Sequence, residues 1–219
     1  MKRKLILYSI LTAMVICGAG IGTFYWYKAT HYVQTEDARI AGDIYKVTPR
    51  ITGKLTSFPI KAGDTVVADQ IVGQQDIANL SNSALDQAFL RSPISGTVIQ
   101  TAAKVGEVVS TSQAVAMVVD KSKLYVSANI EETEMVKLKL GQKVDFTIDT
   151  FKGKTLTGTL YEIGEATAST FSLLPATNTS GNFTKVTQRI TVKISIDDQQ
   201  GLNLSPGMNS NVKIHINEG

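Results

Sequence analysis

The chain has 219 residues, 43% of them hydrophobic and 19% charged, which suffices for one or two modest domains with a sizeable core and excludes disorder over most of its length. One cysteine excludes an internal disulfide and any multi-cysteine metal site, and two histidines leave little for imidazole chemistry. The formal net charge of +3 comes from Lys2, Arg3 and Lys4, since the rest of the chain carries 19 positive and 19 negative residues. No nucleic-acid partner is therefore indicated.

The first element is a predicted transmembrane anchor helix over residues 5–27, which hold 23 residues without a formal charge. As a helix this run is about 34 Å long, enough for the hydrocarbon core of a bilayer. Positive charge in residues 1–4 predicts a cytoplasmic N-terminus, and the aromatic cluster at 24–27 suits the far interface. The alternative is a cleaved secretory signal, but its possible cleavage site, Cys17-Gly18-Ala19, falls inside the apolar run. An uncleaved signal-anchor is favoured.

The remaining chain is predicted to be mainly β. Residues 28–46 form a linker and a first barrel strand, and strict alternation of apolar and polar residues indicates half-buried strands at 143–149, 189–196 and 211–217. Helical patterns are short and occur only at 80–89 and 131–140.

An internal repeat with an offset of 43 residues relates 51–72 to 94–115. The matched pairs are Gly53 and Gly96, Lys61 and Lys104, Gly63 and Gly106, Val66 and Val109, Gln70 and Gln113, and Val72 and Val115. Matched glycines permit turns with positive φ. Each half is predicted to be short strands joined by turns, and the two halves together would close a small flattened barrel.

These halves, which read TPRITGKL…KAGDTV…QIVGQQD (48–76) and RSPISGTV…KVGEVV…QAVAMVVD (91–120), resemble the split lipoyl domain of HlyD-type membrane fusion proteins, the periplasmic adaptors. The segments 124–149, 171–194 and 204–214 are similar to the EmrA-like branch, and FSLLPATNTSGNFTKVTQR (171–189) is the most specific of them. The resemblance implies a split lipoyl/biotinyl-like β-sandwich (a flattened barrel) at 47–120 and a β-barrel adaptor domain at 121–219.

Two departures from related families limit what the resemblance implies. Residues 76–90 contain no lysine where a lipoyl or biotinyl carrier presents one, so no cofactor is expected; Lys61 and Lys104 are interpreted as repeat positions. Typical adaptors also insert a long α-helical hairpin between the halves. Only about a dozen residues, within the short hairpin at 78–90, are available here, roughly 18 Å even as one helix, which argues against a direct bridge to an outer-membrane channel.

The side chains that could act in catalysis or binding have simpler structural interpretations. The adjacent acids Glu36 and Asp37 would point to opposite faces of a strand and form a solvated boundary. Glu131, Glu132 and Glu134 suit the start of a short helix, where capping and solubility are their expected roles. His31 has no evident partner. The polar stretch 164–185 is either a connector or a contact surface. No catalytic, cofactor-binding or metal residue is nominated, and the chain is predicted not to be an enzyme.

The predicted function is that of a non-catalytic, single-pass, extracytoplasmic adaptor of a multidrug efflux or secretion system in the cytoplasmic membrane. The resemblance implies an integral-membrane transporter of the major facilitator or ABC type as partner, and a homo-oligomer. The alternative is a membrane-tethered scaffold or binding module without a transporter, which the short hairpin keeps open.

Overall fold

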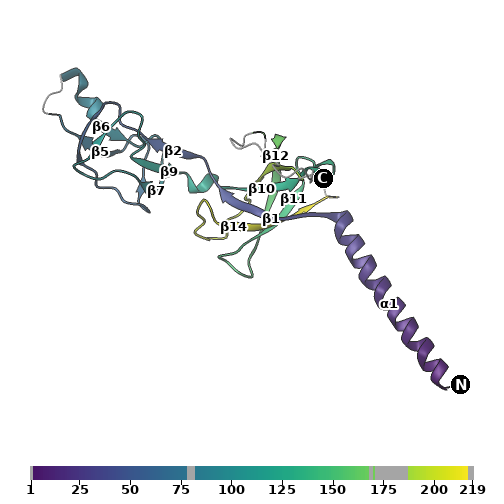
Figure 1. Cartoon of the computed structure of the whole chain (residues 1–219). Helices are drawn as coiled ribbons and strands as arrows, with labels where there is room; N and C mark the ends of the chain where they lie inside the picture. The colour runs from purple at the N-terminus through teal and green to yellow at the C-terminus, as the bar shows by residue number, and fades with distance from the viewer. Residues whose placement is uncertain (1, 78–81, 168–169, 171–186, 217–219) are drawn as a thin grey trace, which may run out of the picture. The chain divides into compact units, whose positions relative to one another are not determined.

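The computed structural model describes residues 2–77, 82–167, 170 and 187–216. Helix α1 (Lys2–His31) contains the whole uncharged run of the sequence. Within the described residues, no helix is found that combines the length and the apolar character needed to cross a membrane. After α1 the described chain is almost entirely strand and turn, so the predicted mainly β class is confirmed (Figure 1).

The described chain divides into two compact units, and the strands of one unit are not contiguous in sequence. The barrel unit holds α1, most of β1 and the strands from Val126 onward, whereas the second unit holds β2 to β9 together with Leu204–Pro206. The chain therefore begins the barrel, builds the second unit, and then returns to complete the barrel.

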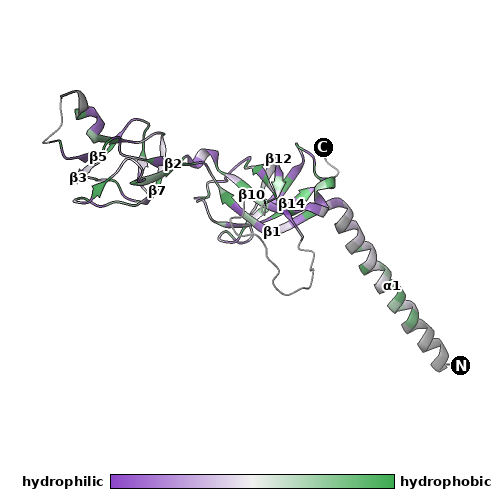
Figure 2. Cartoon of the chain, turned by 45° about the horizontal axis from the view of Figure 1, so that its top comes forward, coloured by the Kyte–Doolittle hydropathy of each residue, from purple (hydrophilic) through white to green (hydrophobic). Residues whose placement is uncertain are grey.

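Six described strands close the barrel in the order β1-β10-β13-β12-β11-β14. Their bounds are β1 (Tyr32–Ala41), β10 (Tyr125–Glu131), β11 (Lys143–Ile148), β12 (Thr155–Thr167), β13 (Arg189–Ser195) and β14 (Asn209–His215). The strands predicted from alternation correspond to β11, β13 and β14 and are confirmed. Polar and apolar residues alternate along β10 and β14 (Figure 2), as expected when one face of a strand packs inward.

Buried side chains of the barrel come from every strand of it. Below 3% exposed are Val33, Val126, Ala128, Ile130, Val144, Phe146, Ile148, Leu156, Leu160, Val192, Ile194 and Ile214. The interior is thus filled by side chains, which makes the barrel a packed core rather than a channel.

The second unit consists of two four-stranded sheets with the orders β2-β9-β7-β4 and β6-β5-β3-β8. The strands are β2 (Ile44–Val47), β3 (Gly53–Ser57), β4 (Thr65–Val66), β5 (Ile71–Gln75), β6 (Phe89–Arg91), β7 (Gly96–Thr101), β8 (Val108–Val109) and β9 (Ala116–Val119). Their core includes Val47, Leu55, Val66, Val72, Leu90, Val98, Val109 and Val118.

The predicted repeat is confirmed by the pairing registers. Gly53 pairs with Val109, and a shift of 43 residues converts this pair into the observed pair of Gly96 with Val66. The same shift converts the pair of Val47 with Ala116 into the observed pair of Leu90 with Gly73. The two halves therefore exchange strands around an approximate two-fold axis, and neither half holds a complete sheet.

The short helical patterns appear as 3-10 helices. Helix η1 (Asn82–Ala88) lies in the expected hairpin, and η3 (Glu132–Lys137) follows β10. A third, η2 (Lys121–Lys123), follows β9. Residues 78–81 of the hairpin lie outside the described residues.

Candidate functional site

The two adjacent acids of β1, Glu36 and Asp37, are both exposed on the barrel. In the pairing of β1 with β14 the register shifts between Thr35 and Ala38, and both Glu36 and Asp37 are exposed. Both acids therefore belong to the solvated surface of the barrel, as expected for this pair.

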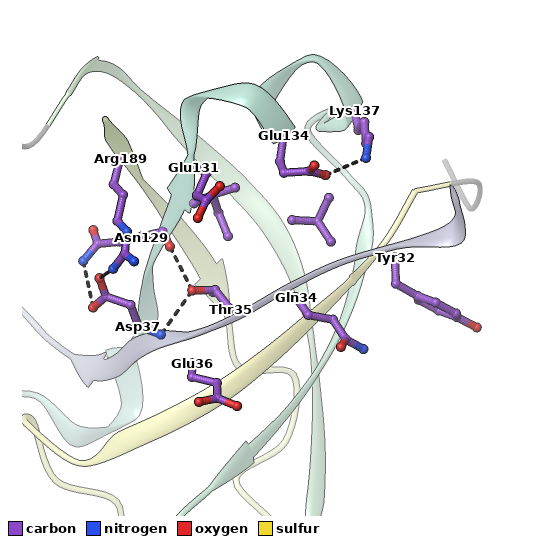
Figure 3. Close-up of a pocket in the computed structure, with 12 residues that line it drawn as sticks. Tyr32, Gln34, Thr35, Glu36, Asp37, Asn129, Glu131, Glu134, Lys137 and Arg189 are labelled. Atoms are coloured by element: carbon purple, nitrogen blue, oxygen red, sulfur yellow. Dashed lines mark hydrogen bonds and ion pairs between the residues drawn. The ribbon is translucent and has the colours of Figure 1, made fainter. Parts of the chain in front are cut away.

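Asp37 is the centre of a hydrogen-bonded network across three strands (Figure 3). Its Oδ1 accepts from Nδ2 of Asn129 at 3.2 Å, and its Oδ2 pairs with the guanidinium of Arg189. Asn129 in turn accepts from the hydroxyl of Thr191 at 2.8 Å through its side chain and from the hydroxyl of Thr35 at 2.9 Å through its carbonyl. Asp37 and Arg189 lie 152 positions apart, so no local pattern of the sequence could have brought them together.

The network forms one wall of a polar groove of about 710 Å³ on the barrel. Helix η3 contributes Glu134 and Lys137, whose charged groups pair at 2.6 Å, and Glu131 precedes it. Because Arg189 and Lys137 each pair with a carboxylate, the groove keeps an excess of negative charge at Glu36 and Glu131. Its chemistry suits a polar contact surface.

The three acids lie at the start of a short helix, as expected, but their side chains differ in what they contact. Glu131 occupies the N-cap position of η3 but its side chain makes no capping hydrogen bond, so a capping role for this side chain is wrong. Glu132 and Glu134 lie in the first turn, and Glu134 instead pairs with Lys137.

Both histidines have local partners within the barrel unit. The ring of His31 stacks on Tyr27 at 3.9 Å, and its Nδ1 lies 2.9 Å from the carbonyl oxygen of Tyr27. Nε2 of His215 lies 2.8 Å from Oδ2 of Asp145, a residue 70 positions away that no local sequence pattern connects with it. The ring of Tyr32 meets His215 edge-on at 5.1 Å. Among the described residues there is no group of three or more His, Cys, Asp or Glu side chains placed to hold a metal ion.

The two matched lysines of the second unit lie in matched turns. The N–H of Lys61 donates to Oδ2 of Asp64 at 2.8 Å, and the N–H of Lys104 donates to Oε2 of Glu107 at 3.0 Å. Both turns are completed by a glycine with positive φ, +98° at Gly63 and +96° at Gly106. The backbone of each lysine is thus part of a turn that the other half repeats, in keeping with the interpretation of both as repeat positions.

The hairpin end of the second unit carries a small ionic cluster. Asp86 on η1 accepts from Arg91 at 3.0 Å and from Arg50 at 3.4 Å. All three side chains are at least 31% exposed, so the cluster orders the surface of the hairpin rather than forming a buried site.

Asp120, between β9 and η2, is a described residue whose pKa is shifted by its hydrogen bonds. The hydroxyl of Ser122 donates to its carboxylate at 2.6 Å and the N–H of the same residue donates at 3.0 Å. These two bonds, with a smaller contribution from Lys123, lower the pKa of Asp120 from its ordinary value. Asp120 therefore stays ionised as the N-cap of η2.

Most of the polar stretch 164–185 and of the string 171–189 lies outside the described residues. The structure therefore places only the beginning of this segment, at the end of β12, and its end, at the start of β13.

Two family models match consecutive parts of the chain. The model described as an RND MFP barrel-sandwich hybrid domain matches residues 43–121, which form the second unit, and the model described as a YknX-like beta-barrel domain matches residues 124–214.

Two relatives carry names that refer to efflux or to resistance. A putative efflux system component of Bacillus subtilis, YhbJ, is 38% identical over 193 residues, which cover 85% of this chain and 81% of the relative. The colistin resistance protein EmrA of Acinetobacter baumannii is 36% identical over 146 residues, covering 65% of this chain but only 41% of that longer protein.

A solved structure, the membrane fusion protein Spr0693 of Streptococcus pneumoniae, shares the fold with a TM-score of 0.60 at 15% identity, over 84% of this chain and 97% of that one. On the two matched domains and the relative matched over most of its length, the chain belongs to the membrane fusion protein family of periplasmic adaptors, and the predicted resemblance to its EmrA-like branch is confirmed.

Proposed function

We propose that this protein is the membrane-anchored extracytoplasmic adaptor of a multidrug efflux or secretion transporter. The observation that carries the proposal is the similarity to a putative efflux system component, which extends over 85% of the chain and so includes both units. An adaptor role also suits a chain whose described surface offers a polar groove and matched turns.

The anchor in this proposal is the N-terminal helix. Its 23 uncharged residues at 5–27 follow a basic N-terminus, which favours a cytoplasmic start and a single pass through the cytoplasmic membrane. The division of the rest into a linker with a first strand at 28–46, a lipoyl-like domain at 47–120 and a β-barrel domain at 121–219 is part of the same proposal.

Proteins of this family are not catalytic, and the chain is accordingly not an enzyme. Its contribution to transport lies in binding. The partner we propose is an integral-membrane transporter of the major facilitator or ABC type, with several copies of the chain assembled on it.

The hairpin limits how far such an adaptor reaches. Thirteen residues separate Gln75 of β5 from Phe89 of β6, and they span at most about 20 Å as a single helix. We therefore propose that the adaptor acts close to its own membrane and does not meet an outer-membrane channel directly.

The test of the transporter partner is cross-linking of the full-length chain in intact membranes, followed by affinity purification and mass spectrometry. We expect a polytopic transporter to be captured repeatedly. If only self-cross-links appear while a known adaptor and transporter pair is captured in parallel, the adaptor proposal is wrong and the alternative, a membrane-tethered scaffold without a transporter, takes its place.

The topology has a separate test, because Cys17 is the only native cysteine. In a Cys17→Ser background, a cysteine at Lys152 should react with a membrane-impermeant maleimide in intact spheroplasts. A cysteine at Lys2 should react only after permeabilisation. The reverse pattern would place the barrel in the cytoplasm and contradict the proposal.

A further inference from the structure

The turn between η3 and β11, residues 136–143, exposes large apolar side chains. Val136 is 91% exposed and Leu140 is 63% exposed, whereas Leu138 between them is 7% exposed and packs into the barrel. Lys139 and Lys143 are exposed on the same turn. We name residues 136–143 the lysine-leucine turn.

The lysine-leucine turn is held firmly, so this exposure is not the result of a loose loop. Gln142, 1% exposed, donates through Nε2 to the carbonyl oxygens of Lys137 at 3.0 Å and Ile216 at 3.2 Å. Its Oε1 accepts from the N–H of Lys139 at 3.1 Å, and the N–H of Gly141 donates to the carbonyl of Leu160 at 2.8 Å. Because the buried Gln142 side chain is fully hydrogen-bonded, it fixes the backbone of the turn. The side chains of Val136 and Leu140 are therefore held in an exposed position.

The lysine-leucine turn lies close to the end of α1, which indicates what its exposed side chains contact. Ile216, which accepts from Gln142, donates its own N–H to the carbonyl of His31 at 3.0 Å, and His31 is the last residue of α1. Two hydrogen bonds thus connect the turn to the end of the helix. If α1 is the anchor proposed above, with the aromatic residues up to Tyr27 at the interface, His31 lies about 6 Å beyond them.

The two exposed lysines of the turn favour contact with an anionic surface. Lys139 and Lys143 are exposed, and Tyr161, 44% exposed, follows Leu160, which pairs with the turn. Exposed apolar side chains combined with lysines and an aromatic residue are typical of segments that lie in the headgroup region of a bilayer. The other lysine, Lys137, is neutralised by Glu134.

We propose that the lysine-leucine turn is a second membrane contact of this protein: Val136 and Leu140 enter the headgroup region, and Lys139 and Lys143 bind the phosphates of anionic phospholipids. This inference rests on the proposed anchor. It would hold the barrel against the membrane surface and remove free rotation about the end of the helix.

The test uses the full-length chain with Cys17→Ser, reconstituted into vesicles of phosphatidylglycerol and phosphatidylcholine. An environment-sensitive fluorophore is attached through Leu140→Cys and, as a matched control, through Lys152→Cys. Lys152 lies in the turn at the opposite end of β11, about 20 Å away along that strand. We expect spin-labelled headgroup-region lipids to quench the fluorophore at position 140 and to leave the one at 152 unaffected.

The charges are tested in the same vesicles. Lys139→Gln with Lys143→Gln should lower the ratio of quenched to unquenched fluorophore at position 140 by roughly fivefold per lysine, and pure phosphatidylcholine should have a similar effect. The charge-matched pair Lys152→Gln and Lys154→Gln should leave the ratio unchanged when the fluorophore is at position 140.

The contrary outcomes are separable. Protein that floats with the vesicles but shows no quenching at position 140 overturns the membrane contact and leaves the anchor intact. Protein that does not float overturns the anchor, and with it the contact. Disulfide-linked dimers of unlabelled Leu140→Cys without lipid quenching would assign the turn to a second copy of the chain, and quenching that appears only with a co-reconstituted transporter would assign it to that partner; either overturns the proposal.

Discussion

Asp37 and Glu36 are neighbours on β1, yet Asp37 alone of the two takes part in the hydrogen-bonded network of the barrel surface. Asp37 accepts from Asn129 of β10 and pairs with Arg189 of β13, so its carboxylate connects three strands. The side chains of Asp37 and Arg189 are 46% and 49% exposed, which means that solvent screens most of their attraction.

Asp37→Ala should therefore lower the free energy of unfolding by only about 1 kcal/mol, the sum of one half-exposed ion pair and one hydrogen bond. Glu36→Ala is the matched control and should change it by less than about 0.5 kcal/mol, as is usual for an exposed surface position. Denaturant unfolding of both variants measures the difference. A loss of several kcal/mol for Asp37→Ala would show that the network is a buried structural element and not a surface one.

Asp120 gives a pH-dependent prediction. Its pKa is lowered in the folded protein, first by the Ser122 hydroxyl and then by the Ser122 N–H, so ionisation of Asp120 favours the folded state at pH values above the ordinary aspartate range. Asp120→Ala should cost about 1 kcal/mol at neutral pH, as for the loss of an N-cap. The difference between wild type and variant should shrink as the pH falls through the lowered pKa. Unfolding curves over a pH series check this, and a difference that grows in acid would contradict it.

At the level of elements, the repeat places glycines at matched positions for different reasons. A Cβ on Gly53 would meet nothing closer than Nε2 of Gln75 at 3.4 Å, an ordinary contact. A Cβ on its counterpart Gly96 would lie 2.4 Å from the carbonyl oxygen of Val119, which is part of the neighbouring strand. Of these two matched glycines, only Gly96 is required by the close approach of two backbones.

Gly96→Ala should thus destabilise the second unit by about 3 kcal/mol, since an overpacked strand must move. Gly53→Ala should be tolerated within about 1 kcal/mol. Thermal unfolding of the two variants makes the comparison. Equal losses would mean that the matched glycines serve the same purpose in both halves.

The sequence predicted those elements in which residues or whole segments recur at a regular spacing. The alternation in β11, β13 and β14 and the 43-residue repeat were sufficient to place strands and to match the two halves. Strand β12 was not predicted, because its glycines interrupt the alternation; a Cβ on Gly158 would lie 1.9 Å from the carbonyl oxygen of Ser195 on β13. The register shift between Thr35 and Ala38 and the partners of Asp37 could not be predicted, since both depend on strands far away in sequence.

For the whole molecule, the two units have separate buried cores. Ile194 is fully buried in the barrel, and Val98 is fully buried among the core residues of the second unit. Ile194→Ala should cost the barrel about 2–5 kcal/mol through the cavity it leaves. Hydrogen exchange followed by mass spectrometry should then show faster exchange in barrel strands and unchanged exchange in β3, β5, β7 and β9, with the opposite result for Val98→Ala. Faster exchange in both units from either variant would indicate one cooperative structure.

Among the described strands, the barrel joins the first, β1, to the last, β14. Tyr32 at the start of β1 pairs with His215 near the end of β14, with more than 180 residues of chain between them. Contacts of such long sequence separation form late, after the local ones. During synthesis the second unit, whose β2–β9 strands lie within 44–119, can form while the barrel is still open. Closure of the barrel must wait for β14, so a ribosome that stalls before β14 has been synthesised would leave β1 and β11 each with an unpaired edge.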